Sequence, residues 1–132
     1  MPRLVVLALI LGLLAGCGGT TDSSGDFEGA EQDVATTIED LEEAAQEDEP
    51  RRICQALLAK AVVQRIEASG ADCTKAVDKA LDQTDTFSLT VEDVEVRGST
   101  ATARVETGVD EEKVETVELV REGDAWKISK LP

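Results

Sequence analysis

In the stretch Phe87–Val96, FSLTVEDVEV, the spacing of apolar residues changes from three or four positions to two. Up to Val91 the apolar side chains alternate with polar ones, which is typical of a half-buried β-strand. Val94 and the next apolar residue continue the alternation on the opposite parity, so one extra residue is needed to keep the apolar side chains on one face. We therefore predict a strand over 86–97 with a β-bulge at Glu92–Asp93.

Three further segments downstream show the same alternation and are separated by turn residues. The turns are expected at Arg97-Gly98-Ser99, in the acidic segment Val109–Lys113, and at Glu122-Gly123-Asp124. Short connections join antiparallel neighbours, so the sequence predicts a four-stranded antiparallel meander. Its remaining strands are expected over 100–107, 114–121 and 125–130.

Upstream, apolar residues recur every three or four positions, which is typical of amphipathic helices. Pro50 suits the first position of a helix, and Gly70 suits a helix C-terminus. Helices are expected over 28–46, 50–69 and 74–83. The outer face of the first one is acidic, and its like charges weaken it as an isolated helix; it carries Glu31, Glu39, Asp40, Glu42 and Glu43.

Helices followed by a meander make the predicted fold class α+β, with N-terminal helices packed on a four-stranded antiparallel sheet. The domain is expected to span 27–132. Five apolar residues are candidates for its core or for the wall of a pocket: Leu57, Phe87, Leu89, Trp126 and Ile128.

The N-terminus reads as a targeting segment. A short basic start is followed by Leu4–Ala15, an uncharged apolar run of 12 residues. A membrane-spanning helix needs roughly 20, so the run fits a signal peptide. It ends in Leu14-Ala15-Gly16-Cys17, which resembles the bacterial lipobox.

The lipobox resemblance implies that residues 1–16 are removed and that Cys17 carries a diacylglyceryl group. Two acyl chains suffice for stable anchoring, so the protein is expected on the outer face of the cell membrane. The small polar residues that follow suggest a flexible tether over 17–26. The alternative is an unlipidated signal peptide in which Cys17 is incidental.

The chain has three cysteines. With Cys17 assigned to lipid, Cys54 and Cys73 remain in an oxidising compartment, where a disulfide is the default. The alternative is two buried free thiols. Sequence does not show whether the two Cα atoms come close enough for a bridge.

Composition excludes several classes of function. The net charge is −15 for the whole chain and −16 for residues 17–132, since the signal peptide contains one arginine and no acid. Such a charge argues against binding nucleic acid and against lying flat on anionic lipid headgroups. The chain contains no histidine and no tyrosine, so histidine-based catalysis and histidine-ligated metals are excluded.

The last predicted turn and strand contain Gly123–Ile128, GDAWKI, which resembles the final strand of the nuclear transport factor 2-like superfamily, a cystatin-like α+β fold. The cysteine pair within Ile53–Leu58 and Gly70–Cys73 is similar to that of secreted actinobacterial lipoproteins of this type. The resemblance implies a cone-like domain with a pocket. Catalytic members use an Asp base with Tyr or acid donors, so without tyrosine no catalytic residue is carried over.

These features favour a lipid-anchored extracytoplasmic binding or protein-interaction module of the bacterial envelope. Its partners would be the membrane, through the anchor, and an apolar ligand, a peptide or a protein. The alternatives are a small apolar-ligand carrier, or a divalent-cation-binding protein that uses the acidic first helix or Asp110-Glu111-Glu112. Catalysis by Glu92 and Asp93 is disfavoured because adjacent strand residues point to opposite faces. No catalytic residue, metal site or cofactor is expected.

Overall fold

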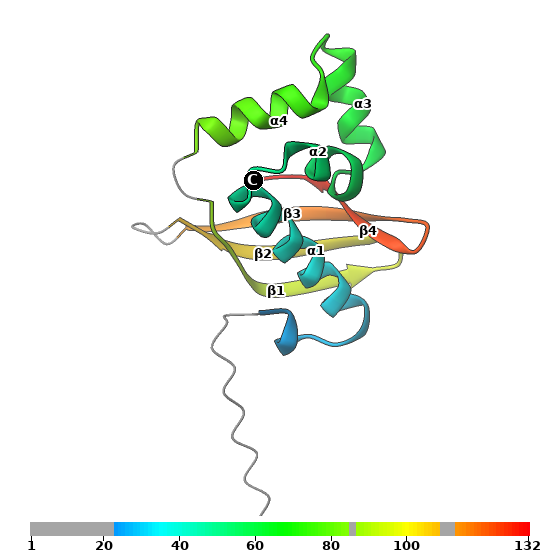
Figure 1. The fold of residues 1–132 in the computed structure, drawn as a ribbon. Helices are drawn as coiled ribbons and strands as arrows, with labels where there is room; N and C mark the ends of the chain where they lie inside the picture. The colour runs from blue at the N-terminus through cyan, green and yellow to red at the C-terminus, as the bar shows by residue number, and fades with distance from the viewer. Residues whose placement is uncertain (1–22, 85–86, 109–112) are drawn as a thin grey trace, which may run out of the picture.

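The computed structural model describes residues 23–84, 87–108 and 113–132. The predicted signal peptide, Cys17 and the acidic segment 109–112 lie outside the described residues. The first half of the described chain is helical, with the elements η1 Ser23–Asp26, α1 Gly29–Gln46, α2 Pro50–Arg52, η2 Ile53–Leu57, α3 Lys60–Ala68 and α4 Cys73–Asp82. The second half is a sheet of β1 Leu89–Arg97, β2 Thr100–Thr107, β3 Lys113–Glu122 and β4 Ala125–Lys130. The predicted α+β class is confirmed (Figure 1).

The sheet is the predicted antiparallel meander, with strand order β1-β2-β3-β4. The bulge in β1 is also confirmed, because Val91 pairs with Val105 while Asp93 pairs with Arg104, which leaves Glu92 as the extra residue. β1 begins three residues later than expected, so Phe87 precedes the strand. A second irregularity, in the β3–β4 pairing, was not predicted.

Helix α1 crosses one face of the sheet and contacts β1, β2 and β4 (Figure 1). Its buried stripe includes Val34, Ile38 and Leu41. These side chains belong to the same core as Leu119 and Ile128 of the sheet, which are fully buried. Burying a side chain of this size contributes about 1.5–3 kcal/mol, so α1, with few favourable charge pairs of its own, depends on this packing.

The chain before α1 is more ordered than a tether. Ser23–Asp26 form a short 3₁₀-helix, η1, that contacts both α1 and β1. The predicted tether over 17–26 is therefore wrong for its last four residues, and the folded domain starts at about Ser23 rather than Phe27.

The single helix expected over 50–69 is wrong. The structure divides it into α2, the π-helix η2 and α3, with Leu58 and Ala59 extended between η2 and α3. The Leu58 amide donates to the Ile53 carbonyl (2.9 Å), and the Ala59 amide donates to the Ile128 carbonyl of β4 (2.8 Å). Leu58 also forms an isolated parallel bridge with Ile128.

The break has a packing cause. Leu57, Leu58 and Ala59 are all buried, and three successive residues of an α-helix cannot all face the same side. The extended segment buries all three and supplies a backbone partner to the edge strand β4. Ala61, two residues beyond this segment, is exposed.

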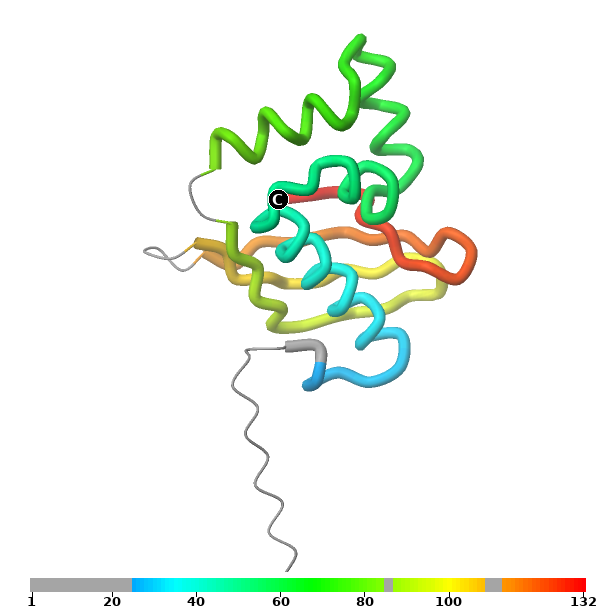
Figure 2. Tube along the Cα trace, in the orientation of Figure 1, coloured from blue at the N-terminus to red at the C-terminus, as the bar shows by residue number. Residues whose placement is uncertain are grey.

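Helices α3 and α4 lie beyond the β4 edge of the sheet (Figures 1 and 2). In Figure 2 the chain leaves the sheet along α3, and α4 then runs back in the direction of the start of β1. Gly70, with φ +89°, follows the end of α3 as predicted. Asp72 caps α4 by accepting a hydrogen bond from the Lys75 amide (3.1 Å). Helix α4 contacts α2, η2 and α3.

The break can be tested with proline. Lys60 is the first residue of α3 and follows an extended residue, Ala59 (ψ 147°), and both positions suit an X-Pro step. Lys60→Pro should therefore cost only about 1 kcal/mol, for the lost hydrogen bond of the Lys60 amide. Gln64→Pro, inside α3, should cost about 3 kcal/mol or more. Urea unfolding measures both, and equal costs would mean that the helix is continuous.

Candidate binding groove

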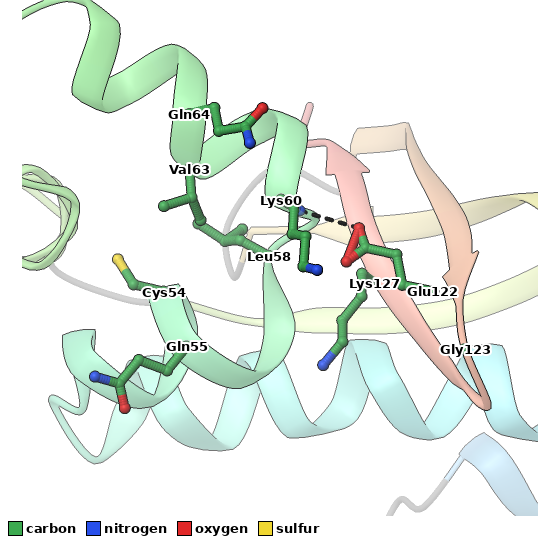
Figure 3. A pocket seen from close by; sticks show the side chains of 9 residues that line it. All are labelled: Cys54, Gln55, Leu58, Lys60, Val63, Gln64, Glu122, Gly123 and Lys127. Atoms are coloured by element: carbon green, nitrogen blue, oxygen red, sulfur yellow. Dashed lines mark hydrogen bonds between the residues drawn. The ribbon is translucent and has the colours of Figure 1, made fainter.

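A groove of about 570 Å³ opens between the η2–α3 segment and the β3–β4 hairpin (Figure 3). Its volume is in the range of small-ligand sites. The lining residues come from both halves of the chain: Cys54, Gln55, Leu58, Lys60, Val63, Gln64, Glu122, Gly123 and Lys127. The groove therefore exists only because the extended step Leu58–Ala59 docks on β4.

Hydrogen bonds join the two walls. The Lys60 amide, at the start of α3, donates to Glu122 Oε2 at the end of β3 (3.0 Å). Ala59 at the N-cap makes no side-chain capping bond, so Glu122 serves as the cap from another element. Gly123, with φ +63°, makes the tight hairpin turn next to it.

The groove combines an apolar wall with cationic groups. Leu58 and Val63 provide the apolar surface. Lys60, Lys127 and Glu122 line the hairpin side of the groove, where the Lys127 ammonium points away from Glu122 (Figure 3). The Lys127 ammonium donates to the Ala56 carbonyl in η2, while the Lys60 ammonium has no partner within the described part of the chain.

None of the five residues predicted for the core or for the wall of a pocket lines this groove. Leu57, Leu89, Trp126 and Ile128 are buried in the core, and Phe87 is half-buried against it. Leu57 and Trp126 also line a second cavity of about 370 Å³ beside α1.

The sequence analysis did not identify Lys60, Glu122 and Lys127 as site residues. It predicted one continuous helix over 50–69, and such a helix would not form the groove. The one available indication was the apolar run Leu57-Leu58-Ala59, which is too wide for one helix face.

The predicted pairing of Cys54 with Cys73 is confirmed. The two residues form a disulfide with a Cα–Cα distance of 6.1 Å, which is within the usual range for a bridge. It links the π-helix η2 to the first residue of α4. Both cysteines are buried, and Cys54 also lines the groove.

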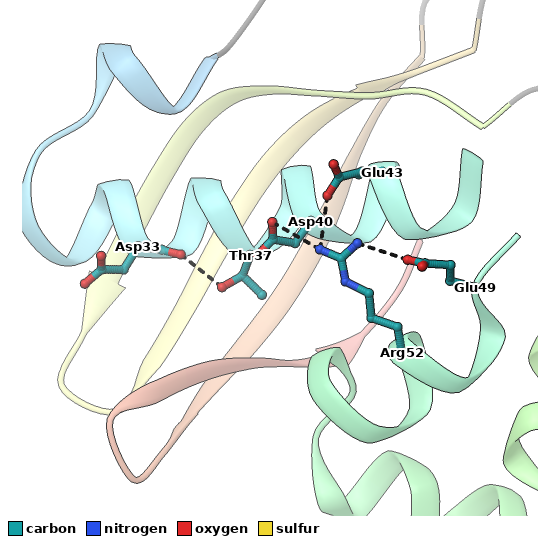
Figure 4. A network of polar contacts seen from close by, with 6 residues as sticks. All are labelled: Asp33, Thr37, Asp40, Glu43, Glu49 and Arg52. Atoms are coloured by element: carbon teal, nitrogen blue, oxygen red, sulfur yellow. Dashed lines mark hydrogen bonds and ion pairs between the residues drawn. The ribbon is translucent and has the colours of Figure 1, made fainter. Parts of the chain in front are cut away.

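Arg52 joins α1 to the helical segment beside the groove (Figure 4). Its guanidinium lies 3.0 Å from Glu43, 3.1 Å from Glu49 and 3.7 Å from Asp40. Hydrogen bonds to Glu49 and Glu43 raise the pKa of Arg52. Partial burial raises the pKa of Asp40, and the charge of Arg52 opposes that rise.

The alternative sites proposed from sequence receive no support from geometry. Glu92 and Asp93 are both exposed at the bulge, and the segment 110–112 lies outside the described residues. In the described ranges, no group of three or more Cys, Asp or Glu side chains is placed to hold a metal ion. No helix among those residues has the length and apolarity required to cross a bilayer.

Replacing Arg52 should destabilise the protein and raise the pKa of Asp40 further, because burial remains while the opposing positive charge is lost. A raised carboxyl pKa favours the folded state at low pH, and that contribution is lost as the pH rises through the folded pKa. Arg52→Ala should therefore be more destabilising at about pH 7 than at about pH 3, where carboxyls are protonated.

The measurements are urea unfolding at both pH values and carboxyl NMR titration of Asp40. Arg51→Ala is the matched control, since Arg51 is exposed and is the neighbouring arginine. Equal effects of the two variants, or an unchanged pKa of Asp40, would contradict the network.

Removing the disulfide should destabilise the protein by about 3 kcal/mol, because the bridge closes a loop of about 20 residues. The double variant Cys54→Ser/Cys73→Ser tests this by urea unfolding and amide hydrogen exchange. Helices α3 and α4 should lose more protection than β2 and β3, since α4 packs on α2, η2 and α3. A uniform loss across the domain would show that the bridge has no local role.

No protein-family model, no curated protein and no solved structure matches this chain. The functional argument therefore depends on the groove and on the sequence features themselves.

Proposed function

We propose that this protein is a lipid-anchored extracytoplasmic module of the bacterial envelope, which uses the groove between α3 and the β3–β4 hairpin to bind a peptide or a protein segment. Its N-terminal Leu14-Ala15-Gly16-Cys17 motif supports the anchor. The groove is the observation that supports binding.

Three properties of the groove favour a binding role. It is built on irregular backbone, since η2 is a π-helix, and π-helical turns occur frequently at functional sites. Its walls are connected by the Lys60–Glu122 hydrogen bond, so its shape exists before a partner arrives. Its lining includes the exposed amide side chains of Gln55 and Gln64, which can pair with peptide groups.

A carrier for an apolar ligand has less support. The space between α1 and the sheet is occupied by buried side chains of the core, including Ile38, Leu119, Trp126 and Ile128. An internal ligand would have to displace them, and removing or shifting a packed core side chain costs several kcal/mol. A surface groove takes a ligand without that cost.

Site-specific photo-crosslinking in the native host tests the proposal. A photoreactive residue at Gln64, which is exposed at the groove, should give a discrete crosslinked product in the membrane fraction. The same residue at Thr102, which is exposed on β2, is the control. Identical products from both positions, or no product from Gln64, would reject a peptide or protein segment of the envelope as the partner of the groove.

The anchor is tested in the same cells. The mature chain should begin at Cys17 and carry a diacylglyceryl mass, and Cys17→Ser should release the protein from the membrane fraction. An unlipidated mature chain would overturn the proposed location.

A further inference from the structure

We propose that the groove binds a carboxylate of a peptide chain, with the ammonium groups of Lys60 and Lys127 as its charged contacts. This inference rests on the proposed binding function and names the chemistry of the partner at the same groove.

The charged residues that line the groove have a balance opposite in sign to the net charge of the chain. Residues 17–132 have a net charge of −16, yet two lysines and one glutamate provide the charged groups of the groove. One positive charge is therefore left unbalanced there. On so acidic a domain, a local excess of cations favours an anionic partner at this place rather than at another.

The one carboxylate in the groove lining leaves the Lys60 ammonium unused. Glu122 lies in the groove lining, and its carboxylate accepts a hydrogen bond from the Lys60 amide (Figure 3). Because this bond uses the backbone of Lys60 and not its ammonium, the ammonium is available for a second carboxylate. The ammonium of Lys127, which also lines the groove, donates to the Ala56 carbonyl of η2.

The uncharged part of the groove favours a peptide over a bare anion. Leu58 and Val63 form an apolar wall beside the lysines, where an apolar side chain next to the carboxylate would be buried. Gln55 and Gln64 can donate to and accept from peptide groups. A ligand that satisfies all three features has a carboxylate, an apolar side chain and an amide backbone.

Short peptides are titrated into the full mature lipoprotein in detergent micelles. Binding is measured by changes in the amide NMR chemical shifts of the protein. Acetyl-Leu-Ala has a free C-terminal carboxylate, acetyl-Leu-Glu-amide has a side-chain carboxylate, and acetyl-Leu-Gln-amide is uncharged. We expect at least one charged peptide to shift the signals of Lys60, Val63 and Lys127, and the uncharged peptide to bind roughly tenfold more weakly. The better of the two charged peptides identifies the source of the carboxylate.

Lys60→Gln provides the decisive variant, because it keeps the backbone amide that binds Glu122 and removes only the ammonium. It should abolish the preference for the charged peptides, whereas Lys79→Gln on exposed α4 should leave it unchanged. Equal affinities for charged and uncharged peptides, shifts elsewhere on the domain, no shifts with any peptide, or equal effects of the two variants would overturn the inference.

The result of the peptide titration can be distinguished from the result of the crosslinking experiment. A discrete crosslink at Gln64 together with no charge preference rejects the carboxylate and keeps the binding module. Carboxylate binding without any crosslinked partner supports the chemistry of the groove and rejects a macromolecular partner in the envelope.

Discussion

The hydrogen bond from the Ala59 amide to the Ile128 carbonyl attaches the segment between η2 and α3 to the edge of the sheet. Strand β4 is last in the order β1-β2-β3-β4, so its outer edge has backbone groups without a strand partner. A continuous helix could not pair with them, because its own amides are used internally. An extended step of two residues can, and the break at Leu58 and Ala59 supplies it.

The other features of this side of the molecule follow from that attachment. The step redirects the chain, so α3 and α4 lie beyond the sheet edge and pack largely on other helical elements. The disulfide between Cys54 and Cys73 then provides a restraint that core packing provides elsewhere. The groove occupies the angle between the redirected helix and the β3–β4 hairpin, and the Lys60–Glu122 bond keeps that angle fixed.

The acidic side chains of α1 have structural partners that periodicity did not indicate. Glu42, expected on a solvated face, accepts a hydrogen bond from the Leu89 amide at the start of β1 (2.5 Å). Gln46 donates to the Phe87 carbonyl (3.1 Å). Arg52 binds carboxylates on the same helix. These contacts help explain how a strongly acidic helix remains packed on the sheet despite the like charges along it.

The local sequence pattern was sufficient to predict those elements whose residues interact with near neighbours in the sequence. The β-strand alternation, the parity change that requires the bulge at Glu92, and the turn residues Gly98 and Gly123 each depend on side-chain period and backbone freedom, which the sequence displays directly. The pairing of Cys54 with Cys73 was predicted from the number of cysteines and from the oxidising compartment expected for the protein. The break at Leu58 and the groove did not follow, since helical propensity around them is uninterrupted.

The amino-acid sequence alone thus determines an α+β chain with a meander whose register is set by its apolar side chains. Only the tertiary structure places Lys60, Glu122 and Lys127 around one groove. The reason is that the partner of Ala59 is a carbonyl at Ile128, far along the chain. A backbone hydrogen bond between two such distant residues leaves no period in the sequence from which it could be predicted.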